Sequence, residues 1–407
     1  MVFPSFTFLS LMFAILFRVL EFKSVLDAEE IDLKLLRKLA FSVGCPHEES
    51  VRSKCWKILL NYLPLKRQDW KKHLQEQRAT YRQFIDEMIV QPGAKHDFSE
   101  REDVTFEDHP LNPNPDSEWS QFFKDNEMLI QIDKDCRRLC PDLAFFQSAT
   151  PHPCVDVIKN ERRLNSLRKR VEQSTLRSQI ISKNRLGITT ADFKRPKKSA
   201  YDDFVVLPEG EEAHWEVAER ILFVYAKLNP GQGYVQGMNE ILGPIYYTMA
   251  SDADDDTQEN AEADSFWCFT NLMSEIRDNF IKHLDESECG IGSLMRRFMS
   301  TVQDKDMALY LKLIEQDVKP QFFAFRWLTL MLSQEFQLPD VQRLWDTLFA
   351  DGDRFKFLLY VCCSMLILVR EDLLTNDFSA NMKLLQNYPI TDITRILSKA
   401  VEVSGRL

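Results

Sequence analysis

Apolar residues recur along most of this chain with the spacing of an α-helix. Positions i, i+3, i+4 and i+7 are apolar in one segment (Trp56, Leu59, Leu60 and Leu63), and helical spacing also runs through residues 215–225. No run of alternating β-branched residues competes with this pattern. The sequence therefore predicts an all-α chain, organised as a single multi-helical domain with polar insertions.

Breaks in the periodicity place several helix ends. Pro64 and Pro230 follow two of the periodic segments and are expected to end them. Residues 322–336 and 357–369 are mostly apolar, which predicts central helices. Glycine is scarce, with 12 residues in 407, and four of these lie between positions 231 and 243. Such a local concentration indicates a sharp turn of the backbone.

Charge and cysteine content exclude several classes of protein. The net charge of −11 argues against general nucleic-acid binding, which depends on neutralising phosphates. Residues 155–200 nevertheless carry thirteen Lys and Arg against four Asp and Glu. Nine scattered cysteines form neither a disulfide framework nor a zinc pattern, so we expect no metal site and a reducing compartment.

The first residues of the chain are unusually apolar. Residues 2–17 contain no charged side chain, but no basic region precedes them and no small-residue cleavage site follows. The stretch is also shorter than the roughly 20 residues that span a bilayer. Its role stays open between a membrane-active segment, a docked or membrane-peripheral helix, and an atypical start of the sequence.

Signatures of an autonomous enzyme are absent from the sequence. The chain has no GxxxxGK[ST] phosphate loop, no HExxH zinc motif and no GxSxG nucleophile turn. This absence leaves room for a protein that acts on the active site of another protein.

The segment 132–138 (IDKDCRR) is the first candidate site. On a helix, Leu129, Ile132, Cys136 and Leu139 share one apolar arc, which leaves Arg138 outside it and Asp135 at its border. Arg138 can then project toward a partner while Asp135 steadies its base. Taken alone, the segment favours a surface helix whose Asp133–Arg137 and Asp135–Arg138 pairs add only about 0.3 kcal/mol each.

The segment 229–239 (NPGQGYVQGMN) is the second candidate. Gln236 lies in it between a helical segment and the apolar residues 241–249, with Gly237 directly after it. A tight turn with glycine lets a backbone approach a ligand or partner closely. A structural turn in which Gln236 caps a helix is the alternative.

Together the two segments resemble the two finger motifs of TBC-domain Rab GTPase activators, IxxDxxR and YxQGM. The matching residues are Ile132, Asp135 and Arg138, followed by Tyr234, Gln236, Gly237 and Met238. Further residues that match the family pattern are Gly44, Pro46, Arg52, Trp56, Trp327 and Trp345. Val235 departs from it, since many members have cysteine there.

The resemblance implies a division of the chain. Residues 44–352 would form the Rab-GAP TBC domain, with insertions near 93–117 and 182–212. Residues 1–21 would precede it as an apolar segment, 22–43 as an N-terminal helix, and 353–407 would add C-terminal helices that pack on the domain.

The resemblance also implies a mechanism. Arg138 would be the arginine finger and Gln236 the glutamine finger that complete the active site of a GTP-bound Rab, with Asp135, Tyr234 and Gly237 positioning them. Arg52, Trp56, Trp327 and Trp345 would be structural. The protein itself would need no cofactor, because GTP and Mg²⁺ belong to the Rab.

We expect the protein to act in the cytoplasm, where it would regulate vesicle trafficking. Residues 2–17 or the insertion near 182–212, which carries several Lys and Arg, would contact a membrane peripherally. A non-catalytic Rab-binding effector or scaffold is the alternative function.

Overall fold

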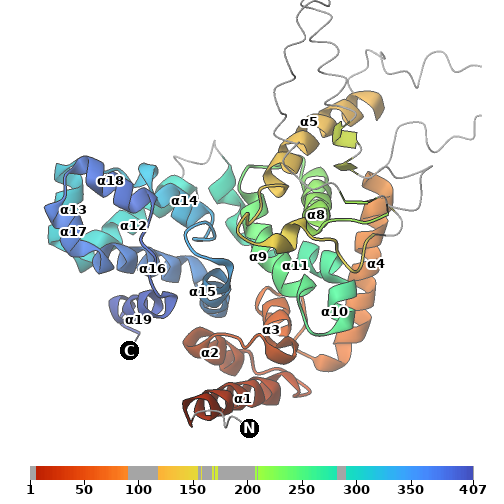
Figure 1. The fold of residues 1–407 in the computed structure, drawn as a ribbon, viewed down its shortest axis with the longest axis horizontal. Coiled ribbons are helices and arrows are strands. Elements are labelled where there is room, and N and C mark those ends of the chain that lie inside the picture. Colours follow the sequence, from red (N-terminus) through yellow and green to blue (C-terminus); the bar gives the residue numbers. More distant parts are fainter. Residues whose placement is uncertain are drawn as a thin grey trace, which may run out of the picture. The chain divides into compact units, whose positions relative to one another are not determined.

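The computed structural model describes residues 6–89, 118–154, 157, 167–168, 170–172, 207–208, 210–281 and 290–406. Helices dominate these residues, which contain two isolated β-bridges and no sheet (Figure 1). The prediction of an all-α fold is confirmed. Of the two predicted insertions, residues 93–117 lie outside the described residues, as does 182–212 up to residue 206.

The chain divides into two compact units. Unit 1 comprises residues 1–78 and 240–407, and unit 2 comprises residues 79–239. Helix α4 (Trp70–Met88) begins in unit 1 and ends in unit 2, and α9 (Met238–Ala250) begins at the end of unit 2.

Unit 1 contains most of the helices. They are α1 (Phe6–Leu26), α2 (Leu33–Val43), α3 (Val51–Leu59), α10 (Asp255–Glu259), α11 (Ala261–Ile276), α12 (Ile291–Lys305), α13 (Met307–Glu315), α14 (Ala324–Thr329), α15 (Leu338–Ala350), α16 (Arg354–Leu368), α17 (Arg370–Thr375), α18 (Phe378–Gln386) and α19 (Ile393–Ser404). Short 3₁₀ turns join them at Glu48–Ser50, Arg67–Asp69, Arg277–Phe280 and Pro320–Phe322 (η6). Among these helices, α15 packs against α2, α3, α16 and α19.

One part of the core of unit 1 is an aromatic cluster around a buried carboxylate. Trp56 lies 6.1 Å from Trp345 and 5.1 Å from Phe349 between ring centroids. The Asp346 carboxylate accepts a hydrogen bond from Trp56 Nε1 at 2.7 Å and forms an ion pair with Arg52 at 3.3 Å. Burial raises the pKa of Asp346, whereas Arg52 opposes the rise. Arg52, Trp56 and Trp345 thus meet at one buried point.

Trp327 belongs to a different part of the core. Its ring packs edge-on against Phe323 at 5.1 Å and against Tyr388 at 5.9 Å. It is fully buried on α14. The four residues assigned to structure therefore occupy two separate aromatic clusters of unit 1.

The predicted single helix over residues 22–43 is wrong, because two helices cover this range. Helix α1 ends at Leu26 and α2 begins at Leu33. The Asp32 side chain accepts hydrogen bonds from the N–H groups of Lys34 and Leu35, which is a helix N-cap. The linker is held elsewhere, since Ile31 N–H donates to the carbonyl of Leu65 at 2.8 Å.

Two other helix boundaries differ from their predictions. Helix α3 ends at Leu59, before Pro64, and Asn61 has a φ of +58°. The predicted helix over residues 322–336 is only α14. Met331 and Leu332 have φ values of +50° and +62°, which no right-handed helix allows. Trp345 Nε1 donates to the Met331 carbonyl at 3.0 Å and so stabilises this turn.

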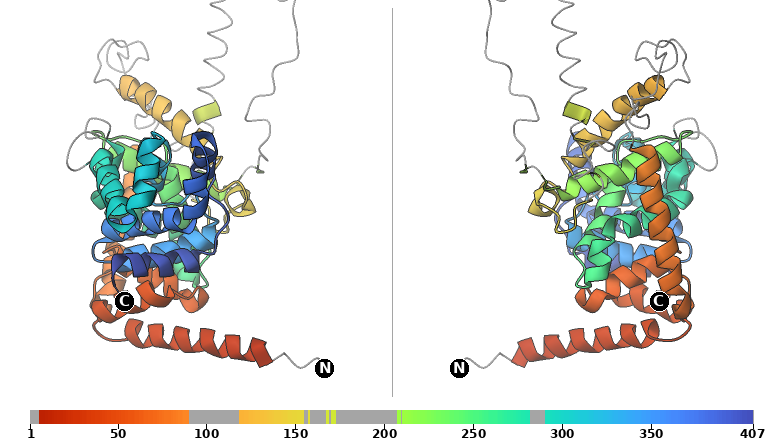
Figure 2. Two further views of the ribbon diagram at one scale, coloured as in Figure 1. Left: turned by 90° about the vertical axis from the view of Figure 1, so that its left-hand side faces the viewer. Right: turned by 90° about the vertical axis from the view of Figure 1, so that its right-hand side faces the viewer.

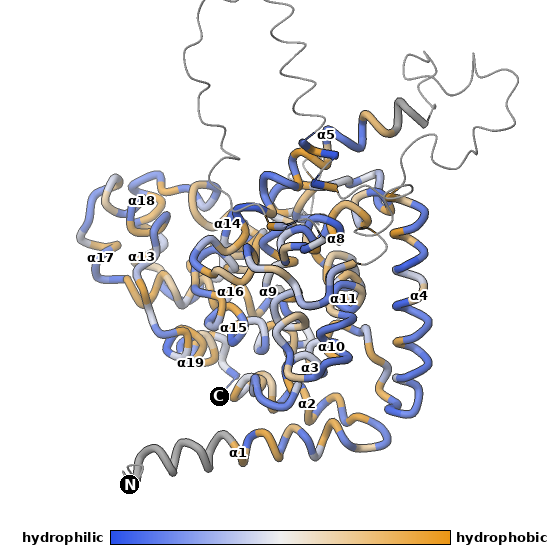
Figure 3. Tube along the Cα trace, turned by 45° about the vertical axis from the view of Figure 1, so that its right-hand side comes forward, coloured by the Kyte–Doolittle hydropathy of each residue, from blue (hydrophilic) through white to orange (hydrophobic). Residues whose placement is uncertain are grey.

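The described part of α1 shows one docked and one exposed side. Val19, Phe22, Val25 and Leu26 are buried, and α1 packs against α2 and α3. Figure 2 shows α1 as a long helix at the start of the chain, and Figure 3 shows hydrophobic positions along its described turns. None of the described helices combines the length and hydropathy that crossing a bilayer requires.

Unit 2 carries both candidate segments. Its main helices are α5 (Glu118–Cys136) and α8 (His214–Leu228), which pack against each other. A 3₁₀ turn, η3 (Ala144–Gln147), contacts α8. Leu167 and Val171, which belong to the basic stretch 155–200, are buried, whereas most of that stretch lies outside the described residues.

Candidate functional site

The apolar arc predicted for α5 anchors the arginine segment. Leu129, Ile132, Cys136 and Leu139 are all buried, so this prediction is confirmed. They lie on the part of the chain that packs against α8. Full burial of a large aliphatic side chain contributes about 1.5–3 kcal/mol, so burial of these side chains stabilises the segment by several kcal/mol.

Arg138 lies just beyond the end of α5. The helix ends at Cys136, and Arg138 N–H donates to the Asp135 carbonyl at 3.2 Å in a turn. The predicted helix is therefore wrong for Arg138 and Leu139, which lie beyond its end, and Cys140 after them has a φ of +44°. Pro141 follows Cys140, and a residue before proline disfavours the right-handed helical region. Proline therefore stops α5 where Arg138 can leave the helical path.

The Arg138 side chain is exposed but oriented. It is 64% exposed, whereas the Asp135 side chain is 6% exposed. Its Nη2 donates to Asp135 Oδ1 at 2.7 Å, and its Nε donates to the carbonyl of Lys134 at 3.0 Å. Two hydrogen bonds thus fix the base of the guanidinium while much of it stays open to a partner.

Gln236 lies on the turn that the glycine pattern predicts. Between α8 and α9 the chain turns through Gly233, with a φ of +65°, and Gly237, with a φ of +103°. Both values favour glycine. The Val235 carbonyl accepts the N–H of Met238, the first residue of α9. Gln236 is exposed, and the alternative in which its side chain caps α9 has no hydrogen bond to support it among the described contacts.

Asp135 joins the two candidate segments. Tyr234, on the glutamine turn, donates from its hydroxyl to Asp135 Oδ2 at 2.9 Å. The other oxygen of the same carboxylate accepts the hydrogen bond from Arg138. One buried carboxylate therefore bridges segments that are 99 positions apart at the residues in contact.

Asn239 is a further contact residue, and the sequence analysis assigns it no role. Its Nδ2 donates to the backbone carbonyl of Asp135 at 3.3 Å, and its Oδ1 lies 3.3 Å from the Tyr234 hydroxyl. The only signal in the sequence is that Asn239 stands next to the YxQGM residues. The contact ties the first turn of α9 to the end of α5.

A buried charge cluster lies under the arginine segment. Asp133 and Arg137 form an ion pair at 3.0 Å, and both are buried, so the surface interpretation of this pair is wrong. The Arg137 guanidinium lies 4.3 Å from the ring of Trp215 on α8. Burial raises the pKa of Asp133, although Arg137 opposes this rise. These contacts hold the last turn of α5 against α8.

Glu219 on α8 completes this cluster in an unusual state. It is fully buried, and neither carboxylate oxygen has a hydrogen-bond partner among the residues that the structure describes. Burial raises its pKa well above the ordinary value, and the neighbouring charge of Asp133 adds to the rise. A protonated Glu219 is the form that burial favours.

The exposed groups of the candidate site suit a partner molecule. Within the described ranges, no group of three or more His, Cys, Asp and Glu side chains is placed to hold a metal ion. The exposed pair of a guanidinium and a carboxamide can instead donate hydrogen bonds to oxygens brought by another molecule.

Comparison with known proteins identifies the family. The model of the Rab-GTPase-TBC domain family matches residues 165–374. TBC1 domain family member 13 of Mus musculus is 62% identical over 390 residues, covering 95% of this chain and 97% of that protein. The human protein of the same name is 61% identical with the same coverage.

The chain belongs to the TBC family.

The TBC fold extends beyond the residues that the family model matches. The solved Ypt/Rab-GAP domain of Gyp1p superposes with a TM-score of 0.65 at 23% identity, covering 96% of this chain and 98% of that one. This likeness shows the fold. The glutamine turn lies within the matched residues 165–374, and Arg138 precedes them.

Proposed function

We propose that this TBC protein is a GTPase-activating protein for a Rab-family small GTPase. In this proposal Arg138 and Gln236 enter the active site of the GTP-bound Rab and complete it. Membership of the TBC family and the near-full-length similarity to TBC1 domain family member 13 support the partner class.

One observation carries the proposal: the Asp135 carboxylate holds both segments. It accepts hydrogen bonds from Arg138 and from Tyr234, two residues before Gln236. A single positioning group therefore sets the base of the arginine and the start of the glutamine turn. Preorganised donors of this kind are effective because they need no rearrangement when charge develops.

The two exposed side chains suit the two tasks of GTP hydrolysis. Negative charge on the transferring phosphoryl group must be stabilised, and the attacking water must be oriented. The Arg138 guanidinium stays charged and donates in a planar fork, which suits the first task. The Gln236 carboxamide both donates and accepts, which suits a water molecule. An arginine supplied in trans accelerates hydrolysis by about 10³–10⁵, or about 4–7 kcal/mol of barrier.

The protein acts here as an activator without a reaction of its own. GTP and Mg²⁺ come with the Rab, and this chain needs no cofactor. By promoting GTP hydrolysis the protein would convert its Rab to the GDP-bound form. Vesicle trafficking is the process that it would regulate in this way.

The start of α1 supplies a peripheral membrane contact in the cytoplasm. Leu16, Phe17 and Leu20 are exposed on its described part, and residues 2–15 before them are largely apolar. Flotation with liposomes should recover the full chain and lose a Phe17→Asp variant. Equal recovery of the two proteins would contradict the contact.

A GTP-hydrolysis screen against a panel of purified Rab proteins tests the proposed activity. The wild-type protein should stimulate at least one Rab, and Arg138→Ala and Gln236→Ala should each abolish stimulation. Arg67→Ala is the matched control, because Arg67 is also an exposed arginine paired with an aspartate, at 3.0 Å. Stimulation that survives both finger variants would refute the proposal, and Rab–GTP binding without stimulation by the wild-type protein would establish an effector instead.

A further inference from the structure

The backbone carbonyl of Arg137 loses its helical partner at the end of α5. In a continuing helix the carbonyl of residue i accepts the N–H of residue i+4, which for Arg137 is position 141. Pro141 occupies this position and has no N–H to donate. Carbonyls at helix ends are satisfied instead by side chains, by water or by tighter turns. The end of α5 therefore leaves a place for a donor from another segment.

Gln147 provides such a donor. Its Nε2 donates to the Arg137 carbonyl at 2.9 Å. The same peptide unit carries the N–H of Arg138, which donates to the Asp135 carbonyl at 3.2 Å. Both polar groups of the peptide unit that precedes the arginine finger are therefore hydrogen-bonded, and rotation of this unit would break at least one of the two bonds.

The short turn that carries Gln147 is itself fixed to α8. Phe146 in η3 is fully buried, and the ring of Phe145 stacks on His214, the first residue of α8, at 4.0 Å between ring centroids. The Ser148 carbonyl accepts the N–H of His214 at 3.1 Å. Gln147 thus lies between two anchored neighbours, and its amide is held at a fixed place beside the end of α5.

The hydrogen bond from Gln147 acts on the backbone of the finger, whereas Asp135 acts on its side chain. The Asp135 carboxylate accepts a hydrogen bond from Arg138 Nη2. The orientation of the peptide unit between Arg137 and Arg138 sets the direction in which the Arg138 side chain leaves the chain. Because this side chain is long, a small rotation at its base produces a larger displacement of the guanidinium. A misplacement of ~1 Å at a catalytic group can cost about 100-fold in rate.

We propose that Gln147 is a positioning residue of the arginine finger. Its amide fixes the peptide unit between Arg137 and Arg138, and so sets the direction in which Arg138 enters a Rab. This role rests on the proposed function, since Arg138 is a finger only if the protein activates a GTPase. It belongs to a residue outside both finger motifs.

The variant Gln147→Met tests the proposal, because methionine is close to glutamine in length and shape and has no donor. Single-turnover GTP hydrolysis by the stimulated Rab is measured over a range of concentrations of this protein. The maximal rate should fall by about fivefold or more, the effect of losing one hydrogen bond between neutral groups. The half-saturating concentration should stay within about twofold, because Gln147 acts through Arg138 and does not bind the Rab itself. Gln147→Lys, which keeps an N–H donor at a similar reach, should recover most of the maximal rate.

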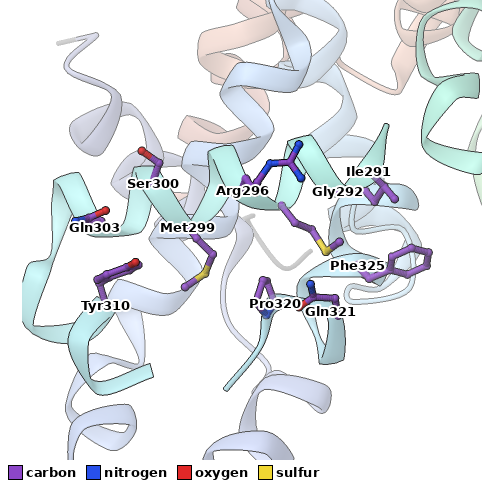
Figure 4. A pocket seen from close by; sticks show the side chains of 11 residues that line it. Ile291, Gly292, Arg296, Met299, Ser300, Gln303, Tyr310, Pro320, Gln321 and Phe325 are labelled. Atoms are coloured by element: carbon purple, nitrogen blue, oxygen red, sulfur yellow. The ribbon is translucent and has the colours of Figure 1, made fainter. Parts of the chain in front are cut away.

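The variant Gln316→Met is the matched control. Gln316 belongs to unit 1, where it directly follows α13, one of the helices around the groove in Figure 4. Like Gln147 it is half-buried, and its Nε2 donates to a carbonyl at a helix end, that of Asn376 after α17, at 2.7 Å. The control removes the same kind of hydrogen bond from the other unit, so its maximal rate should equal that of the wild type. Thermal unfolding should show one cooperative transition for both variants.

Hydrogen–deuterium exchange in the protein alone gives a second readout that needs no Rab. Residues 136–143 should exchange faster in Gln147→Met than in the wild type, and Gln316→Met should leave this segment unchanged. Equal exchange in Gln147→Met would overturn the proposal. So would an unchanged maximal rate, or a loss confined to the half-saturating concentration, in a protein whose stimulation Arg138→Ala abolishes, and the proposed function would then stand. If the wild type stimulates no Rab, the proposed function fails and the role of Gln147 fails with it.

Discussion

Removal of one hydroxyl group should weaken GTPase activation without removing either finger. In Tyr234→Phe the ring remains and the hydrogen bond to Asp135 Oδ2, 2.9 Å long, is lost. Asp135 keeps its contact with Arg138, but it no longer ties the arginine to the glutamine turn. We therefore expect both fingers to be present and less well oriented.

The size of the effect follows from the kind of hydrogen bond. A hydrogen bond to a charged acceptor contributes about 1.5–3 kcal/mol. If the bond acts fully on the orientation of the fingers, stimulation falls by about 10- to 150-fold at 1.36 kcal/mol per factor of ten. That loss is smaller than the 10³–10⁵ expected for removal of the arginine itself.

Single-turnover GTP hydrolysis by the cognate Rab measures this effect. A double-mutant cycle with Arg138→Ala should be non-additive, because the hydroxyl acts through the orientation of that arginine. Tyr225→Phe is the control, since the Tyr225 hydroxyl donates to Gln232 Oε1 at 3.1 Å in the same segment. Unchanged stimulation by Tyr234→Phe, or additive losses in the cycle, would refute the role of Asp135 as a bridge.

Three further predictions follow. Arg138→Lys should lose stimulation in the same assay, since an ammonium cannot copy the fork; near-normal stimulation would contradict this. Asp346→Ala should lower the free energy of unfolding by about 3–5 kcal/mol, because it leaves the largely buried Arg52 side chain, which is 13% exposed, without its carboxylate partner; a loss below about 1 kcal/mol in urea titrations would disagree. Glu219→Gln should stabilise the protein at neutral pH. The raised pKa of Glu219 makes the native protein lose stability as pH rises from about 4 through that pKa, by up to about 1.4 kcal/mol per pH unit. A gain in the free energy of unfolding of Glu219→Gln that does not change with pH would show that the ionisation of Glu219 is not its cause.

Local features of the fold could be predicted from the sequence. The buried arc of α5, helix α8, which ends at Leu228 just before Asn229 and Pro230, and helix α9 after Gly237 all follow from periodicity and from residues that break it. These signals lie within a few residues of the feature that they set. Helix ends were less predictable, because tertiary contacts decided them. The turn at Met331 depends on a hydrogen bond from Trp345, fourteen positions away.

Contacts between distant segments could not be predicted from spacing. Asp346 meets Trp56 across 290 positions, and Asp135 meets Tyr234 across 99. Only the resemblance to the TBC family suggested that the arginine and glutamine segments act together. Glu219 could not be singled out either, because nothing in the sequence distinguishes an exposed acidic residue on a helix from one that is buried with no hydrogen bond to the described residues.

In the proposed mechanism this protein, and not the Rab, supplies the glutamine that orients the water. Single-turnover GTP hydrolysis on four combinations tests it, with wild-type protein or Gln236→Ala against an unmodified Rab or one whose switch glutamine is replaced by alanine. We predict that the wild-type protein still stimulates the altered Rab substantially, and that Gln236→Ala fails to stimulate the unmodified one. Strong dependence of hydrolysis on the Rab glutamine, together with indifference to Gln236, would refute the two-finger mechanism.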